Sequence, residues 1–254
     1  MHPAPRPVRL YESMIPSGNA YKVALLLSHL ELPVEVVELD ILASPPETRR
    51  PDFLAKNPNG RVPVVELADG SFLAESNAIL FYLAEGTNYL SDQRLERART
   101  LQWMFFEQYS HEPYVAVLKF WTLWGGLDKR RPEDIALWKD RGQQALHVME
   151  QHLVQADFFS GRRYGIADIA LYAYTHTAGD VGFDMAEETT TRSLRRGRRL
   201  LQPRPTTSPL CSGYRRTREA RWRQTSRCVL CPRIQRRWGR RPRSDPRRPA
   251  SSGW

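Results

Sequence analysis

The stretch NPNGRVPVVELADGSFLAES, residues 57–76, decides the fold. Its apolar run at residues 62–67 predicts a β-strand, and Asp69-Gly70 is a typical two-residue hairpin turn. Residues 71–73 predict the returning strand. The segment therefore predicts a β-hairpin that ends directly before Glu75-Ser76.

Pro63 is unusual within a predicted paired strand because proline has no N–H to donate to the ladder. Two interpretations stay open on this residue alone. Residues 62–67 form an edge strand, or the Val62-Pro63 bond is cis and turns the backbone of Val62 outward toward a ligand. After the hairpin, Glu75-Ser76 opens a predicted helix that continues through Ala84, with apolar residues along one face.

Upstream of the hairpin, the chain alternates strand and helix. The pattern predicts a strand at 8–11, a turn at 16–19, a helix at 20–30, a strand at 34–39, and a loop at 43–60 with one helical turn near 53–55. The order is β-α-β, loop, β-β-α. This order predicts an α/β domain.

Downstream, residues 92–185 show helical periodicity and abundant aromatic residues. One stripe at helical spacing consists of Leu95, Ala98, Leu101, Gln102, Phe105 and Tyr109, and Trp103, Phe106 and Trp121 add aromatic bulk. Such a stripe usually belongs to a core, and an open apolar pocket is the alternative. This half is predicted to be all-α.

These motifs, in this order, resemble the N-terminal thioredoxin-like domain of cytosolic glutathione transferases, near the theta- and beta-like bacterial members. The resemblance extends from residue 8 to about residue 185. It implies a thioredoxin-like domain at 8–88, an all-helical domain at 92–185, and a cis bond before Pro63.

The resemblance implies that Ser17, in the turn after the first strand, is the catalytic hydroxyl. A neutral hydroxyl acts by donating a hydrogen bond to the glutathione thiolate, and Asn19 is a candidate second donor. A plain turn residue or helix N-cap is the alternative for Ser17. Tyr11, a competing hydroxyl, is interpreted as core or as pocket wall.

The same resemblance places glutathione against the hairpin. Ser76, at a helix N-terminus, is expected to bind the γ-glutamyl carboxylate, and Glu75 the ammonium. Val62, turned outward by Pro63, is expected to pair through its backbone with the cysteinyl amide. Arg61 is a candidate for the glycine carboxylate, or else a solvated surface residue.

The electrophile pocket is predicted less closely. Candidates for its walls are Tyr11, Tyr109, His111 and Trp121. The six histidines show no metal-ligand spacing, so we expect no metal.

A capping motif is expected near residue 165. The family normally has Ser or Thr there, followed three residues later by Asp, whereas this chain has Gly165 and Asp168. Asp168 is still expected to accept backbone N–H groups, and Tyr164 and Ile169 to form a hydrophobic staple. Replacing the hydroxyl residue by glycine costs only a few tenths of a kcal/mol.

The formal net charge of +10 arises from the end of the chain. Residues 186–254 contain 20 Arg, no Lys and 4 acidic residues, whereas residues 1–185 contain 18 basic and 24 acidic residues. The composition predicts a disordered basic tail, typical of out-of-frame reading of a GC-rich gene. A selected nucleic-acid-binding arm is the alternative, and we expect no nucleic-acid partner.

The resemblance therefore implies a glutathione transferase that activates the thiolate for attack on a small electrophile, as in detoxification, and it implies a homodimer. A cytoplasmic location is expected because no stretch is typical of a secretion signal or membrane span. The alternative is a non-catalytic binding or partner module of the same fold.

Overall fold

The computed structural model describes residues 5–185, and the predicted disordered basic tail at 186–254 lies outside them. One four-stranded sheet forms the first half of these residues, in the order β2-β1-β3-β4. The strands are β1 (Pro7–Ser13), β2 (Glu35–Leu39), β3 (Val64–Leu67) and β4 (Phe72–Ala74). The predicted strands are all present.

The sheet contains both parallel and antiparallel pairs of strands. Leu10 of β1 pairs in parallel with Val36 of β2, and β1 runs antiparallel to β3, where Leu10 pairs with Val65. Strand β4 returns antiparallel to β3 through the hairpin. The thioredoxin-like fold of this half is confirmed.

The segment around Pro63 decides between the two sequence interpretations. The Val62-Pro63 bond is cis, and β3 begins only at Val64. Strand β3 lies between β1 and β4, so the edge-strand interpretation is wrong. Proline avoids the lost ladder donor by preceding the paired residues rather than lying among them.

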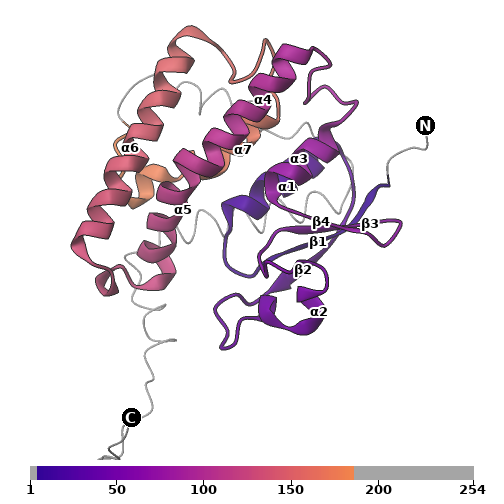
Figure 1. Ribbon diagram of the computed structural model, residues 1–254, viewed down its shortest axis with the longest axis horizontal. Coiled ribbons are helices and arrows are strands. Elements are labelled where there is room, and N and C mark those ends of the chain that lie inside the picture. Colours follow the sequence, from indigo (N-terminus) through magenta and orange to yellow (C-terminus); the bar gives the residue numbers. More distant parts are fainter. Residues whose placement is uncertain (1–4, 186–254) are drawn as a thin grey trace, which may run out of the picture.

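Helices cover both faces of this sheet (Figure 1). They are α1 (Gly18–His29), α2 (Pro51–Leu54) and α3 (Ser76–Ala84), with a short 3₁₀ segment η1 (Glu47–Arg49) before α2. Figure 1 shows α1 and α3 on the face directed toward the second half, and α2 on the opposite face.

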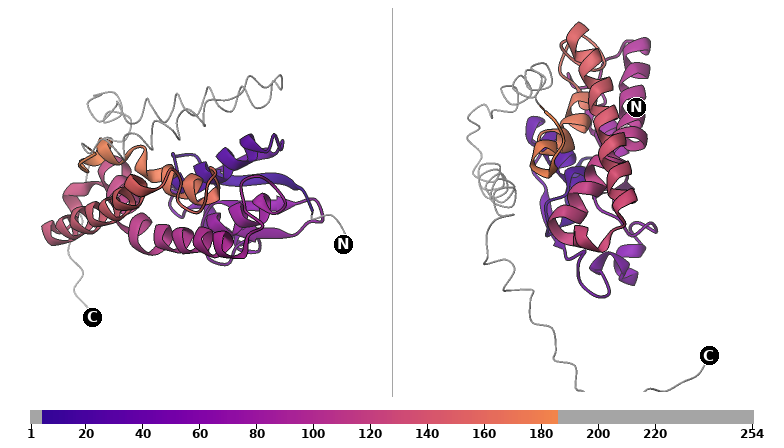
Figure 2. Two further views of the ribbon diagram at one scale, coloured as in Figure 1. Left: turned by 90° about the horizontal axis from the view of Figure 1, so that it is seen from above. Right: turned by 90° about the vertical axis from the view of Figure 1, so that its left-hand side faces the viewer.

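The second half is helical, as predicted, and lies beside the sheet (Figure 2). Its helices are α4 (Arg94–Phe106), α5 (Glu112–Phe120), α6 (Pro132–Gln155) and α7 (Ile166–Thr175). Two π-helical segments, η2 (Glu107–His111) and η3 (Trp121–Gly125), flank α5, and the 3₁₀ segments are η4 (Leu127–Lys129) and η5 (Ala178–Val181). The division into domains at 8–88 and 92–185 stays a prediction.

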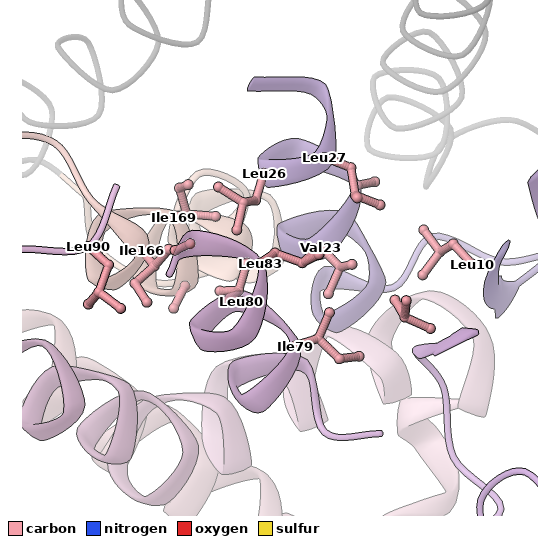
Figure 3. Packing of buried hydrophobic residues seen from close by; sticks show 14 of the residues in the cluster. Leu10, Val23, Leu26, Leu27, Ile79, Leu80, Leu83, Leu90, Ile166 and Ile169 are labelled. Carbon is pink, nitrogen blue, oxygen red and sulfur yellow. The ribbon is translucent and has the colours of Figure 1, made fainter. Parts of the chain in front are cut away.

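The two halves share one hydrophobic core (Figure 3). Val23 and Leu26 of α1 and Leu80 of α3 pack in the same cluster as Ile166 and Ile169 of α7, and all five are fully buried. A second cluster fills the space between α5, α6 and α7. Because the first cluster crosses the boundary, α1 and α7 are held side by side, and this contact positions the site described below.

The aromatic stripe on α4 is not part of this core. Leu95 is 61% exposed, Phe105 68% and Tyr109 84%, whereas Trp103 and Met104 on another face are buried. The expectation of a core position is therefore wrong for Leu95, Phe105 and Tyr109, whereas Trp103 lies in the core and Phe106 packs against it. Helical spacing identifies a continuous face, but it does not say which of two apolar faces meets the rest of the protein.

The start of α7 has the expected capping carboxylate. Asp168 Oδ2 accepts from the Gly165 N–H at 2.9 Å, and Oδ1 accepts from the Phe159 N–H at 3.1 Å. Tyr164 packs against the cluster that contains Ile169, as the staple requires. Burial raises the pKa of Asp168 to about 7, although the two N–H donors oppose that shift.

Within residues 5–185, no helix combines the length and the apolar character that crossing a bilayer requires.

Replacing Asp168 with alanine should lower the free energy of unfolding by about 1–3 kcal/mol, because two backbone N–H groups lose their acceptor. Urea unfolding measures this. Asp134→Ala, at a half-exposed position in the first turn of α6, is the matched control and should cost less.

The wild-type protein should also carry a pH signature of Asp168. Its folded-state pKa of about 7 exceeds the ordinary 3.8, so the folded state holds a proton that the unfolded chain releases between these values. The free energy of unfolding therefore falls as pH rises through this window, and it falls less in Asp168→Ala. If the free energy of unfolding changed equally with pH in wild type and in Asp168→Ala, the raised pKa of Asp168 would be contradicted.

Candidate functional site

Ser17 lies in the turn between β1 and α1 and is the N-cap of α1. Its backbone is extended, and its Oγ accepts from the Ala20 N–H at 3.4 Å. The side chain is half-buried, so the hydroxyl retains an open side. The N-cap interpretation is thus correct, and it is compatible with a ligand at the same hydroxyl because the helix N-terminus favours an anion there.

Asn19, two residues later, joins the two halves of the molecule. Its Oδ1 accepts from the Ser76 hydroxyl at 3.3 Å, and its Nδ2 donates to Glu112 Oε1 at 3.1 Å. Ser76 begins α3, whereas Glu112 begins α5. The structure therefore brings Ser17, Asn19 and Ser76 together, as the sequence predicts.

Glu75 precedes Ser76 with a left-handed backbone, φ 64°, which is rare for a residue with a side chain. Such conformations cluster at ligand sites, where the surrounding structure maintains them. The Glu75 carboxylate accepts from Asn59 Nδ2 at 3.5 Å. Glu75 thus has a restrained backbone and a side chain on the rim beside Ser76.

Arg61 and Val62 lie at the start of the hairpin. The carbonyl of Arg61 accepts from Asn57 Nδ2 at 2.8 Å, and Asn57 is buried. The Arg61 side chain is exposed and lies close enough to Glu112 to lower its pKa. The ladder begins at Val64, so the backbone of Val62 stays outside it.

The residues proposed as pocket walls are not brought together. Tyr11 is buried against Phe53, and its hydroxyl donates to Glu66 at 2.9 Å, so it belongs to the core between the sheet and α2. Tyr109 is largely exposed on η2, and the Arg130 guanidinium covers the ring of Trp121 at 3.8 Å.

His111 is fully buried, with Nε2 2.9 Å from the hydroxyl of Thr175. Burial lowers its pKa to about 4, so the ring is neutral near pH 7. The side chain therefore lies beneath the surface rather than on an open wall.

Two residues of the helical half reach the site without having been predicted. Glu112 contacts Asn19 as described, and the hydroxyl of buried Tyr174 accepts from the Asn19 backbone N–H at 3.2 Å. Neither has a local signal, because Glu112 is 93 residues from Asn19 and Tyr174 is 155 residues from it. A carboxylate at the start of an otherwise apolar helix is the only hint that the sequence offers for Glu112.

Burial raises the pKa of Glu112, and the neighbouring Glu107 carboxylate raises it further. The hydrogen bond from Asn19 and the charges of Lys22 and Arg61 oppose this shift. Burial also raises the pKa of Tyr174, so its hydroxyl stays protonated and keeps a proton to donate.

Among residues 5–185, no three His, Cys, Asp or Glu side chains gather where they could hold a metal ion.

Comparison with known proteins assigns a family to this arrangement. Residues 7–85 match the model described as glutathione S-transferase, N-terminal domain. The disulfide-bond oxidoreductase YfcG of Escherichia coli is 31% identical over 178 residues, which cover 67% of this chain and 81% of that protein.

Two solved structures extend the similarity through the helical half. A glutathione S-transferase from Pseudomonas fluorescens is 45% identical with a TM-score of 0.71, covering 80% of this chain and 98% of its own. A second glutathione transferase family member from the same species, with two glutathione bound, is 26% identical with a TM-score of 0.61, covering 82% and 92%. The chain belongs to the glutathione S-transferase family.

Proposed function

We propose that this protein is a glutathione transferase that activates the thiolate of glutathione for attack on a small electrophile. The observation that carries the proposal is the convergence at Asn19. Its side chain joins the Ser76 hydroxyl to the Glu112 carboxylate beside the N-cap hydroxyl of Ser17. Two hydroxyls and an amide at two helix N-termini suit a ligand with a carboxylate and a thiolate.

Glutathione offers complementary groups along this surface. We assign its γ-glutamyl carboxylate to the hydroxyl and backbone N–H of Ser76, and its ammonium to Glu75. On binding, the single hydroxyl proton of Ser76 turns from Asn19 Oδ1 to the carboxylate. The backbone of Val62 pairs with the cysteinyl amide, and Arg61 meets the glycine carboxylate. This order runs the tripeptide from the start of α3 toward the start of β3, with the thiol left near α1.

Activation of the thiol then rests on hydrogen bonding rather than on a base. The hydroxyl of Ser17, with the amide of Asn19 as second donor, stabilises the thiolate relative to the thiol. A hydrogen bond to a charged group contributes about 1.5–3 kcal/mol, and a shift of one pKa unit corresponds to about 1.4 kcal/mol. One donor thus lowers the pKa of the thiol by roughly one to two units, which populates thiolate near neutral pH.

A disulfide is a second candidate for the electrophile. The Escherichia coli relative is named a disulfide-bond oxidoreductase, and two glutathione molecules are bound in one Pseudomonas fluorescens structure. In this reaction the thiolate attacks one sulfur, forms a mixed disulfide and expels the other sulfur as a thiolate. A second glutathione then releases the product as glutathione disulfide. We assign both thiols of this reaction to glutathione; the three cysteines of the chain, Cys211, Cys228 and Cys231, lie outside the described residues.

We further propose a cytoplasmic homodimer, in which a second copy covers the exposed face of α3 and α4. A groove of about 790 Å³ lies there, lined by apolar residues that include Phe81, Leu101 and Phe105. Glu75 also lines it, so the face is continuous with the glutathione site. Exposed apolar surface of this kind is typical of an interface.

Replacing Ser17 with alanine should lower kcat/KM for conjugation by about one to two orders of magnitude, through loss of the donor to the thiolate. A chloronitrobenzene and a small dialkyl disulfide, each with excess glutathione, separate the two electrophile classes. Ser17→Thr, which keeps a hydroxyl, should recover much of the rate, and Ser71→Ala is a surface control. Coinciding pH–rate profiles of Ser17→Ala and wild type would remove Ser17 from activation.

The non-catalytic alternative predicts a different outcome in these assays. Wild-type protein would then bind glutathione by calorimetry but turn over neither electrophile class.

Replacing Ser76 with alanine should weaken glutathione binding by about 1–3 kcal/mol, because the γ-glutamyl carboxylate loses a charge-assisted hydrogen bond at a buried position. Isothermal titration calorimetry measures the change in Kd. Ser91→Ala, which removes a hydroxyl just before α4, is the matched control. Unchanged affinity in Ser76→Ala would exclude this residue from the site.

Replacing Phe105 with glutamate should yield a monomer, because the change buries a charge at the proposed interface. Light scattering after size-exclusion chromatography measures the mass. Leu137→Glu, at a 48% exposed position on α6, should leave the dimer intact. A wild-type protein that is monomeric at micromolar concentration would contradict the dimer.

A further inference from the structure

The ring of Tyr174, on α7 of the helical half, packs against the turn Ser17-Gly18-Asn19. A Cβ atom added at Gly18 would lie 2.5 Å from the ring carbons Cε1 and Cζ of Tyr174. Real side chains do not approach so closely, so the contact requires glycine at this position. The backbone of the turn therefore packs directly against the ring of Tyr174.

The hydroxyl of Tyr174 holds the same turn by hydrogen bonds. It accepts from the Asn19 backbone N–H at 3.2 Å and also interacts with the side chain of Ser17. Tyr174 is 7% exposed, so these bonds lie away from water, where leaving a backbone N–H without a partner is costly. One side chain of α7 thus fixes both ends of the turn.

Glu112 constrains the Asn19 amide in a second way. An ionised carboxylate only accepts hydrogen bonds, so the amide must direct its NH₂ group toward Glu112 and its oxygen toward the Ser76 hydroxyl. The NH₂ group has two hydrogens, and Glu112 uses one of them. The second hydrogen remains to donate to a ligand.

We propose that Glu112 and Tyr174 are positioning residues, by which the helical domain sets the Ser17–Asn19 turn to donate to the glutathione sulfur. The proposal rests on the proposed function, since it names how that same site is oriented. Tyr174 sets the backbone of the turn, and Glu112 sets which end of the Asn19 amide faces the sulfur.

The ionisation of Glu112 makes this constraint depend on pH. A protonated Glu112 has an O–H to donate, so it also tolerates the amide oxygen of Asn19, and the orientation is no longer unique. The charged groups that face Glu112 are Glu107, Lys22 and Arg61, with neutral His111 and Tyr174 also near. Because burial raises the pKa of Glu112, the constraint should be lost at a less acidic pH than for a free carboxyl.

The test compares Glu112→Gln and Tyr174→Phe with wild type. Glutamine matches the shape of Glu112 but presents either a donor or an acceptor, and phenylalanine keeps the ring against Gly18 while removing the hydroxyl. Glu133→Gln, on the exposed surface of α6, and Tyr172→Phe, on the same helix as Tyr174, are the matched controls.

The first measurement needs no glutathione. In protein labelled with ¹⁵N-asparagine, the Asn19 side-chain amide signal is identified by its loss in Asn19→Asp. It should titrate with pH in wild type and in both controls, and the titration should vanish in Glu112→Gln. A signal that ignores pH in wild type, or titrates equally in Glu112→Gln, overturns the role of Glu112.

The second measurement is the pKa of the bound glutathione thiol, followed by thiolate absorbance near 240 nm, together with kcat and KM. Both variants should raise this pKa and lower kcat about threefold to thirtyfold, with a smaller change in KM, because glutathione is anchored elsewhere. An unchanged thiol pKa and kcat in a folded Tyr174→Phe overturns the role of Tyr174.

The two measurements also separate this proposal from the proposed function. An Asn19 signal that titrates with Glu112, in a wild-type protein that does not bind glutathione, supports the orientation of the amide but refutes the glutathione site. If Ser17→Ala raises the pKa of the bound thiol while Glu112→Gln and Tyr174→Phe leave it unchanged, the proposed function is supported and the positioning role of Glu112 and Tyr174 is refuted.

Discussion

The structure depends on one buried ion pair between its two halves. Lys22 of α1 donates to Glu107 of η2 at 2.9 Å, and both side chains are fully buried. Asn77 of α3 accepts from Lys22 and donates to the same Glu107 oxygen, and Gln108 also donates to it. Charges so far from water are tolerated only when they are paired and hydrogen-bonded. The arrangement of the three segments is therefore tightly restricted, since small displacements would break the pair.

Each member of this network lies close in sequence to a residue of the candidate site. Lys22 is one helical turn after Asn19, Asn77 directly follows Ser76, and Glu107 precedes Glu112 by the length of η2. The network joins α1, α3 and η2, and η2 continues directly into α5, so the same two helices and the start of α5 meet at the Asn19 amide. Any shift between the halves that broke the pair would also separate Asn19 from Glu112. The buried pair therefore fixes the relative positions of the elements that carry the site residues.

Sequence reasoning found the part of this arrangement that is local. The hairpin, the cis bond at Pro63 and the helix start at Ser76 each have a signal within a few residues, and the structure contains all three. Glu112 and Tyr174 were not predicted as site residues because they reach Asn19 only when distant helices pack together. No residue near them in the chain indicates that contact. The core position expected for Leu95, Phe105 and Tyr109 is wrong for a related reason. Periodicity describes one helix, whereas burial depends on its neighbours.

The π-helical segment η2 has a consequence for how relatives should be aligned. A π-helical turn contains one residue more than the α-helical turn that it replaces, so it resembles a single-residue insertion accommodated within a continuous helix. Each residue of an α-helix advances the next by about 100° around the axis. A relative one codon shorter across residues 107–111 would therefore carry its acidic residue to a different side of the helix, even with an otherwise matching sequence. In this chain, the length of that segment therefore decides, together with the residue type, whether the Glu112 carboxylate reaches Asn19 at the start of α1.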